Sequence, residues 1–163
     1  MGKAIADANR MDTPAGVIAF ARDQRRIADQ AEVELLQAAL AWADLHPVET
    51  TEQAATHVLR GFGDTGLLLG GDGCPLVGEF SVAEFAAAIG LGTESGKHLI
   101  GQALELAHRL PRLWARVEAG QVQAWRARRI AEATIPLTLE AARFVDAQIA
   151  GVAHSVRQWQ VDK

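Results

Sequence analysis

The stretch that decides the fold is Arg109–Thr134, RLPRLWARVEAGQVQAWRARRIAEAT. Proline is common in the first turn of a helix and glycine just after the last one, so Pro111 and Gly120 predict where a short helix begins and ends. Leu113 and Val117 are four residues apart, which places them on one side of that helix. The residues after Gly120 predict a second short helix that runs to the end of the stretch.

A long helix is predicted upstream, over residues 14–45. Thr13 offers a hydroxyl to the first turn, Pro14 suits the first helical position, and Pro47 ends the pattern. At about 1.5 Å per residue this helix is roughly 45 Å long, so we expect other helices to pack along it. Apolar residues at steps of three and four predict one buried stripe, made of Ile27, Ala31, Leu35, Ala38 and Trp42.

A glycine-rich loop is predicted over residues 61–80, with a short extended piece at 75–80. A cluster of shorter helices follows over residues 82–150, and Ser81 is expected to cap the first of them. The sequence therefore predicts an all-α fold, a single multi-helix domain with a long N-terminal helix.

The helical domain is expected to span residues 14–155, after an N-terminal tail of residues 1–13. Ser155 has the character of a helix cap, and residues 156–163 supply only the first turns of the helix that it would start. We therefore expect a truncated helix at this end of the chain.

Composition limits the classes of protein to which the chain can belong. It has 163 residues, 49% of them hydrophobic, which suffices for one domain with a substantial core. The single cysteine, Cys74, excludes an internal disulfide framework and a multi-cysteine zinc site. The N-terminal residues hold no continuous apolar segment of the secretory kind, and no apolar run reaches the ~18 residues that a membrane span needs. We expect a cytoplasmic protein without a membrane partner.

Charge is distributed unevenly along the chain. The net charge is −4, yet between Lys97 and Ile130 seven Lys and Arg residues stand against two acidic residues. A basic segment inside an acidic chain is typical of a surface that binds phosphate groups. The candidate nucleic-acid-binding residues are Lys97, Arg112, Arg116, Arg126, Arg128 and Arg129.

Two interpretations of these basic residues are open. In one, the arginines are exposed and interleave with tryptophan side chains, so that they bind and stack on a nucleic acid such as DNA. In the other, Arg126 and Arg129 pair with Glu32 and Glu34 of the long helix, and the opposite charges neutralise each other within the fold.

Three further motifs resemble known sites and are interpreted structurally. Gly61–Gly66 matches the dinucleotide pattern G-x-G-x-x-G, but that motif needs a strand before it and a helix after it, and the preceding residues read as helix.

Glu105 and His108 could share a helical face, but the chain has no second Glu-x-x-His step for a di-metal site, so we interpret them as a surface pair. Residues 81–107 have the outline of a helix-turn-helix, but the second helix begins with Glu94 and no base-reading side chain. No catalytic residue, cofactor site or metal site is assigned.

Several segments together resemble a known bacterial family. They are VAEFAAAIGLGTES, HLIGQALEL, the Arg109–Thr134 stretch and LEAARFVD, with matching positions at Pro111, Gly120, Trp125 and Arg128. The pattern resembles the domain of unknown function 222 family, best known as the N-terminal helical half of HNH-endonuclease-type proteins. The resemblance covers about residues 15–155 and is strongest over 80–150.

The resemblance implies an α-helical module that normally precedes a nuclease. In that family the catalytic residues belong to a C-terminal HNH module, and this chain contains no HNH-like cluster of His and Asn. We therefore expect a non-catalytic helical domain, DNA-associated or regulatory, without nuclease activity of its own. The alternative is a structural or oligomerisation module, in which the long helix docks on a partner protein or a second copy and no nucleic acid is bound.

Overall fold

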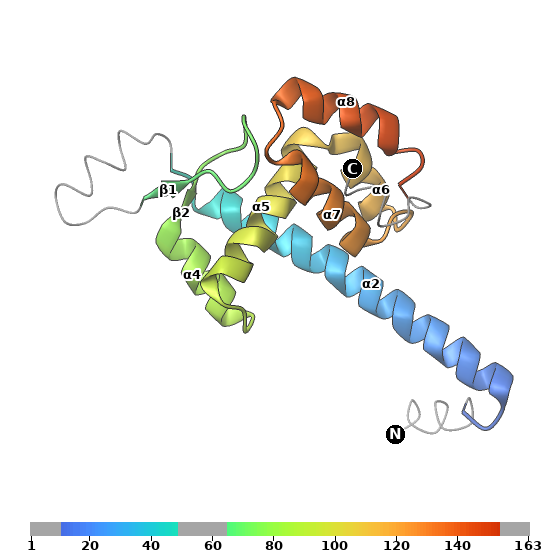
Figure 1. Cartoon of the computed structure of the whole chain (residues 1–163). Coiled ribbons are helices and arrows are strands. Elements are labelled where there is room, and N and C mark those ends of the chain that lie inside the picture. The colour runs from blue at the N-terminus through green and yellow to red at the C-terminus, as the bar shows by residue number, and fades with distance from the viewer. Residues whose placement is uncertain (1–10, 49–64, 154–163) are drawn as a thin grey trace.

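The computed structural model describes residues 11–48 and 65–153 of the chain. These residues form six helices and a two-stranded antiparallel sheet, which confirms the predicted all-α fold (Figure 1). The elements in order are α2 (Pro14–Leu45), β1 (Gly66–Leu67), β2 (Val77–Gly78), α4 (Glu79–Ala88), α5 (Thr93–Arg109), α6 (Pro111–Glu118), α7 (Ala124–Thr134) and α8 (Leu139–Ile149).

Helix α5 is the centre of the fold. Its apolar residues from Leu99 to Leu106 are buried on several sides, and Ile100 and Leu104 are fully enclosed. The C-terminal half of α2, together with α4 and α7, packs directly against α5, and α6 and α8 complete the cluster (Figure 1). A helix that is apolar around most of its circumference has to be covered by other helices, and this explains why α5 carries the core.

The predicted helix ends are confirmed at Thr13, Pro111 and Gly120. The hydroxyl of Thr13 accepts a hydrogen bond from the backbone N–H of Gly16 at 3.1 Å, and α2 begins at Pro14. Helix α6 begins at Pro111, as the sequence predicts. Gly120 follows the end of α6 with φ +70°, a left-handed conformation in which glycine is strongly favoured.

The predicted buried stripe of α2 is wrong at four of its five positions, and only Trp42, which is half-buried, packs against the core. The buried residues of α2 are Val33, Leu36, Ala39 and Ala43, whereas Ile27 of the predicted stripe is 53% exposed. The spacing of the stripe is helical, but the cluster packs on a different side of α2 and only along its C-terminal half. The N-terminal half of α2 projects beyond the other helices (Figure 1).

The glycine-rich loop contains the small sheet. Gly66 pairs with Gly78 and Leu67 with Val77, which confirms an extended piece within residues 75–80. Helix α4 begins at Glu79, earlier than predicted, so Ser81 lies inside its first turn, where the hydroxyl donates to the Gly78 carbonyl at 2.7 Å and does not cap the helix.

The predictions for the two ends of the chain lie largely outside the described residues. These are the N-terminal tail up to residue 10 and the helix start from residue 156. Within the described ranges, no helix combines the length and the apolar character needed to cross a bilayer.

Candidate nucleic-acid interface

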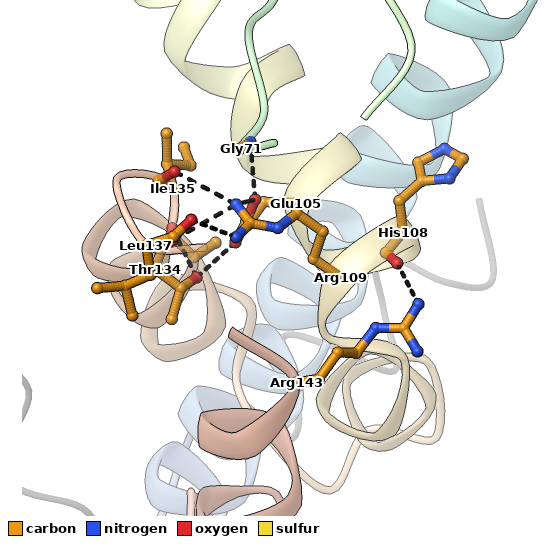
Figure 2. A network of polar contacts seen from close by, with 9 residues as sticks. Gly71, Glu105, His108, Arg109, Thr134, Ile135, Leu137 and Arg143 are labelled. Carbon is orange, nitrogen blue, oxygen red and sulfur yellow. Dashed lines mark hydrogen bonds and ion pairs between the residues drawn. The ribbon is translucent and has the colours of Figure 1, made fainter. Parts of the chain in front are cut away.

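A buried ion pair joins Glu105 and Arg109, one helical turn apart on α5. Arg109 Nη1 lies 3.0 Å from Glu105 Oε2, and both side chains are 0% exposed (Figure 2). The interpretation of Glu105 and His108 as a surface pair is therefore wrong for Glu105. Arg109 likewise adds nothing to a basic surface, although it lies inside the basic segment.

The Glu105–Arg109 ion pair forms hydrogen bonds to two other segments of the chain. Glu105 Oε2 accepts the Gly71 backbone N–H at 2.9 Å, and Glu105 Oε1 accepts the Thr134 hydroxyl at 2.7 Å. Arg109 donates to the backbone carbonyls of Ile135 at 3.2 Å and Leu137 at 2.6 Å (Figure 2). The ion pair thus ties the glycine-rich loop and the α7–α8 connection to the central helix.

Glycine is required at position 71 for this arrangement. A Cβ atom on Gly71 would overlap the Arg109 guanidinium group and press on the Ile135 carbonyl. A buried charge is stable only when it is paired and hydrogen-bonded, and these contacts supply partners for the Glu105 carboxylate and for both terminal nitrogens of Arg109, while Arg109 Nε is buried without a hydrogen-bond partner. The enclosed carboxylate therefore has a structural role rather than a catalytic one.

Cys74, in the same loop, is also buried. Burial, followed by the negative charge of Glu105, raises the pKa of its thiol to about 11. The thiol is therefore protonated at neutral pH, and an activated nucleophile is not formed.

The predicted arginines of α6 differ in exposure. Arg112 is exposed, whereas Arg116 is half-buried and its Nε atom is buried without a hydrogen-bond partner. The start of α6 is held by Asp146 of α8, whose carboxylate accepts the backbone N–H groups of Arg112 at 3.0 Å and Leu113 at 2.9 Å. A carboxylate at a helix N-terminus also opposes the helix dipole favourably.

Arg126 lies at the start of α7, where it stacks on a neighbouring ring. Its guanidinium carbon is 4.9 Å from the centroid of Trp125, and its Nε donates to Gln123 Oε1 at 3.4 Å. Arg129 is half-buried further along the same helix. The pairing of these two arginines with the acids of α2 stays a prediction; Glu34 itself accepts a hydrogen bond from Gln30 on its own helix at 3.1 Å.

Arg128 and Lys97 lie on another side of the molecule. Arg128 Nε donates to Gln102 Oε1 of α5 at 2.7 Å. Lys97 pairs with Glu94 at 2.9 Å, and both line a cleft of about 300 Å³ that also contains Glu132. The six predicted residues therefore do not form one continuous basic face.

The structure instead shows a basic cleft that the prediction missed. Arg22, Arg25 and Arg26 of α2 line a cleft of about 290 Å³ together with the α6–α7 turn and the first residues of α7. Among the described residues that line it, Asp29 is the single acidic one. We call this hollow the arginine cleft. The signal in the sequence is the spacing of Arg22, Arg25 and Arg26, which places all three toward one side of a helix.

The electrostatics of the arginine cleft favour an anion. Arg22 and Arg26 are exposed, and Arg25 pairs with Asp29 at 3.1 Å while its own side chain stays 58% exposed. The opposite wall is the N-terminus of α7, where Gln123 makes no side-chain capping hydrogen bond. The positive end of a helix dipole attracts negative charge, and arginine side chains bind phosphate oxygens in a bidentate manner.

Two of the structural interpretations are supported by the geometry. Gly66, the last glycine of the dinucleotide pattern, begins strand β1 and not a helix; residues 61–64 of the pattern lie outside the described part of the chain. The second helix of the helix-turn-helix outline is α5, which is enclosed by other helices from Leu99 onward, and its exposed first turn begins with Thr93, Glu94 and Ser95. Within the ranges that the structure describes, no three His, Cys, Asp or Glu residues gather as metal ligands would.

Comparison of the chain with protein-family models, curated proteins and solved structures finds no match.

Proposed function

We propose that this chain is a non-catalytic α-helical module that associates with DNA through its phosphate backbone. The observation that carries the proposal is the arginine cleft, in which Arg22, Arg25 and Arg26 face the N-terminus of α7. Arginine side chains and free backbone N–H groups are the donors that proteins most often direct at DNA phosphates. The resemblance to the helical half of HNH-endonuclease-type proteins adds a reason to expect DNA as the partner.

Phosphate contacts of this kind position a protein on DNA and do not read sequence. Arg126, which lies over the Trp125 ring, neighbours the cleft through its contact with Gln123. Arg112 is exposed at the start of α6, at the end of that helix away from the cleft. We therefore propose sequence-independent binding, in which nuclease chemistry, if a complete protein performs it, comes from a separate module.

The experiment is fluorescence anisotropy of a labelled DNA duplex at about 50 mM salt, where phosphate contacts are strong. We expect Arg26→Glu to weaken binding at least tenfold, and similarly for duplexes of unrelated sequence. The matched control is Arg143→Glu on α8, which makes the same change in net charge. Arg143 is exposed, and its Nη2 atom donates to the His108 carbonyl at 3.2 Å (Figure 2).

The outcomes separate the possible surfaces. Equal losses of affinity in Arg26→Glu and Arg143→Glu would show a general charge effect and would reject the cleft. A loss confined to the double variant Arg112→Glu/Arg116→Glu would move the interface to α6. No binding of the unmodified chain at about 50 mM salt would reject DNA association altogether.

A further inference from the structure

The exposed side of α2 is apolar. Val17 is 44% exposed, Ile27 is 53% exposed and Leu35 is 36% exposed. Ala31 and Ala38, on the same side of the helix, are also exposed. At about 100° per residue, these side chains lie around the point opposite Val33, which faces the core. We call Val17, Phe20, Gln24, Ile27, Ala31, Leu35 and Ala38 the α2 stripe. Apart from Gln24 it is apolar, Phe20 within it is half-buried, and no described helix covers it between Val17 and Ala38.

We propose that α2 pairs with α2 of a second copy of this chain, in antiparallel orientation, through the α2 stripe. From Val17 to Ala31 the stripe follows the alternating three- and four-residue steps of a two-stranded coiled coil, and Leu35 and Ala38 continue the same face. An isolated helix with this much apolar surface is costly to leave in water, and burial of the stripe against its own copy removes that cost.

The sizes of the side chains favour the antiparallel orientation. The larger residues Phe20 and Ile27 lie in the N-terminal half of the stripe, and the C-terminal half contains the small residues Ala31 and Ala38 on either side of Leu35. Antiparallel pairing with the symmetry axis near residue 29 places Phe20 opposite Ala38 and Ile27 opposite Ala31 of the other copy. Parallel pairing would place large against large and alanine against alanine, which leaves voids in the alanine layers.

The charges favour the same orientation. The N-terminal half of α2 contains Arg22, Arg25 and Arg26, whereas the segment after it contains Asp29, Glu32 and Glu34. Antiparallel pairing brings the basic segment of each helix beside the acidic segment of the other. Arg25 and Glu32 border the stripe on the same side, so Arg25 of each copy lies near Glu32 of the other.

The pairing is compatible with the rest of the molecule. The arginine cleft and the core residues Leu36 and Ala39 lie on the side of α2 that carries Val33, away from the α2 stripe. Helix α4 borders the C-terminal end of the stripe, where Trp42 packs against Phe85 and donates to the Ser81 carbonyl at 2.9 Å. Two copies related by a two-fold axis can therefore meet along the stripe with their clusters pointing outward. Self-association goes beyond the proposed DNA binding and is tested without DNA.

The test is sedimentation velocity of the full chain at about 50 μM. We expect a species of twice the 17.4 kDa chain mass. Ile27→Glu should reduce it to the monomer by placing a charge within the stripe. The matched control is Ile18→Glu, because Ile18 is also 53% exposed but lies about a third of a turn away from the stripe. Circular dichroism of both variants checks that helix content is retained.

Cross-linking tests the orientation. Oxidation of a mixture of Phe20→Cys and Ala38→Cys chains should give a disulfide-linked dimer, because the two positions face each other. Ala38→Cys alone should give none. Cys74 is buried and does not compete.

Four results would overturn the proposal. They are a monomer at all concentrations up to about 200 μM, a larger oligomer, dissociation by Ile18→Glu as strongly as by Ile27→Glu, and cross-linking of Ala38→Cys on its own, which would show a parallel pair. A monomer that binds DNA would reject the dimer and leave the proposed function standing.

Discussion

The buried ion pair makes a specific prediction about stability. Replacing Glu105 by Gln keeps the shape of the side chain but removes its charge, so the enclosed Arg109 has no counter-ion. One carboxylate oxygen also becomes an NH₂ group, which then faces the backbone N–H of Gly71 and the Arg109 guanidinium, or else the Thr134 hydroxyl. With the amide oxygen toward Gly71 and Arg109, the NH₂ group donates to the Thr134 hydroxyl, which still donates to the Ala131 carbonyl, so the lost charge is the main change.

The expected cost is large. Breaking a buried pair by neutralising one partner typically costs about 3–5 kcal/mol, because the remaining charge is uncompensated. A domain of this size is stable by roughly 5–15 kcal/mol, so Glu105→Gln should remove a substantial fraction of the total. The double variant Glu105→Leu/Arg109→Met removes both charges and should be destabilised by less than the sum of its two single variants.

The assay is urea unfolding followed by circular dichroism and tryptophan fluorescence, with the free energy of unfolding taken from the midpoint and the slope. Glu94→Gln is the control, because it breaks the exposed Glu94–Lys97 pair on the same helix and should leave the midpoint almost unchanged. A destabilisation below about 1 kcal/mol in Glu105→Gln, as at a surface pair, would refute the reasoning. The reasoning would also be refuted if the destabilisation of Glu105→Leu/Arg109→Met equalled the sum of the destabilisations of its two single variants.

Three more predictions concern neighbouring features. Gly71→Ala should destabilise the fold by about as much as Glu105→Gln, since its Cβ would displace the Arg109 guanidinium; an unfolding midpoint equal to that of the unmodified chain would contradict this. Asp146→Ala should cost about 1–2 kcal/mol in urea unfolding, because two backbone N–H groups at the start of α6 are left without their acceptor, and Asp146→Asn should recover part of the stability. The Cys74 thiol, with its pKa raised from an ordinary value of 9.0 to about 11, should react with iodoacetamide with a midpoint near pH 11. Because the folded pKa is the higher one, its contribution to stability is complete below pH 9.0 and is lost as the pH rises toward 11; a reaction midpoint near pH 9.0 in the folded protein would contradict the burial.

Much of the fold could be predicted from local residues. Pro14, Pro111 and Gly120 act through backbone geometry that depends on the nearest neighbours alone, so they predicted helix ends correctly. The direction in which α2 faces its neighbours could not be predicted in the same way. The stripe that includes Ile27 and the face that includes Val33 are both apolar, and the choice between them depends on tertiary packing.

The site was harder to predict because charge along a sequence does not say which residues reach the surface. Arg109 counted toward the basic segment, yet it is enclosed with Glu105, and the spacing of the two by four residues was the available signal. Arg22 and Arg26 were outweighed in the charge balance by the many acidic residues of the first 96 positions. Only the fold brings them to the start of α7, which is distant in sequence.

The most direct test of the proposed function is the salt dependence of DNA binding. The dissociation constant for a labelled duplex is measured by anisotropy between about 50 and 200 mM salt, for the unmodified chain and for Arg22→Ala/Arg26→Ala. If the arginine cleft holds phosphates, the logarithm of the binding constant falls linearly with the logarithm of the salt concentration, and the double variant makes that slope shallower by about one to two units, because each phosphate that an arginine neutralises contributes about 0.9. A variant that keeps both the affinity and the slope of the unmodified chain would contradict DNA binding through the cleft.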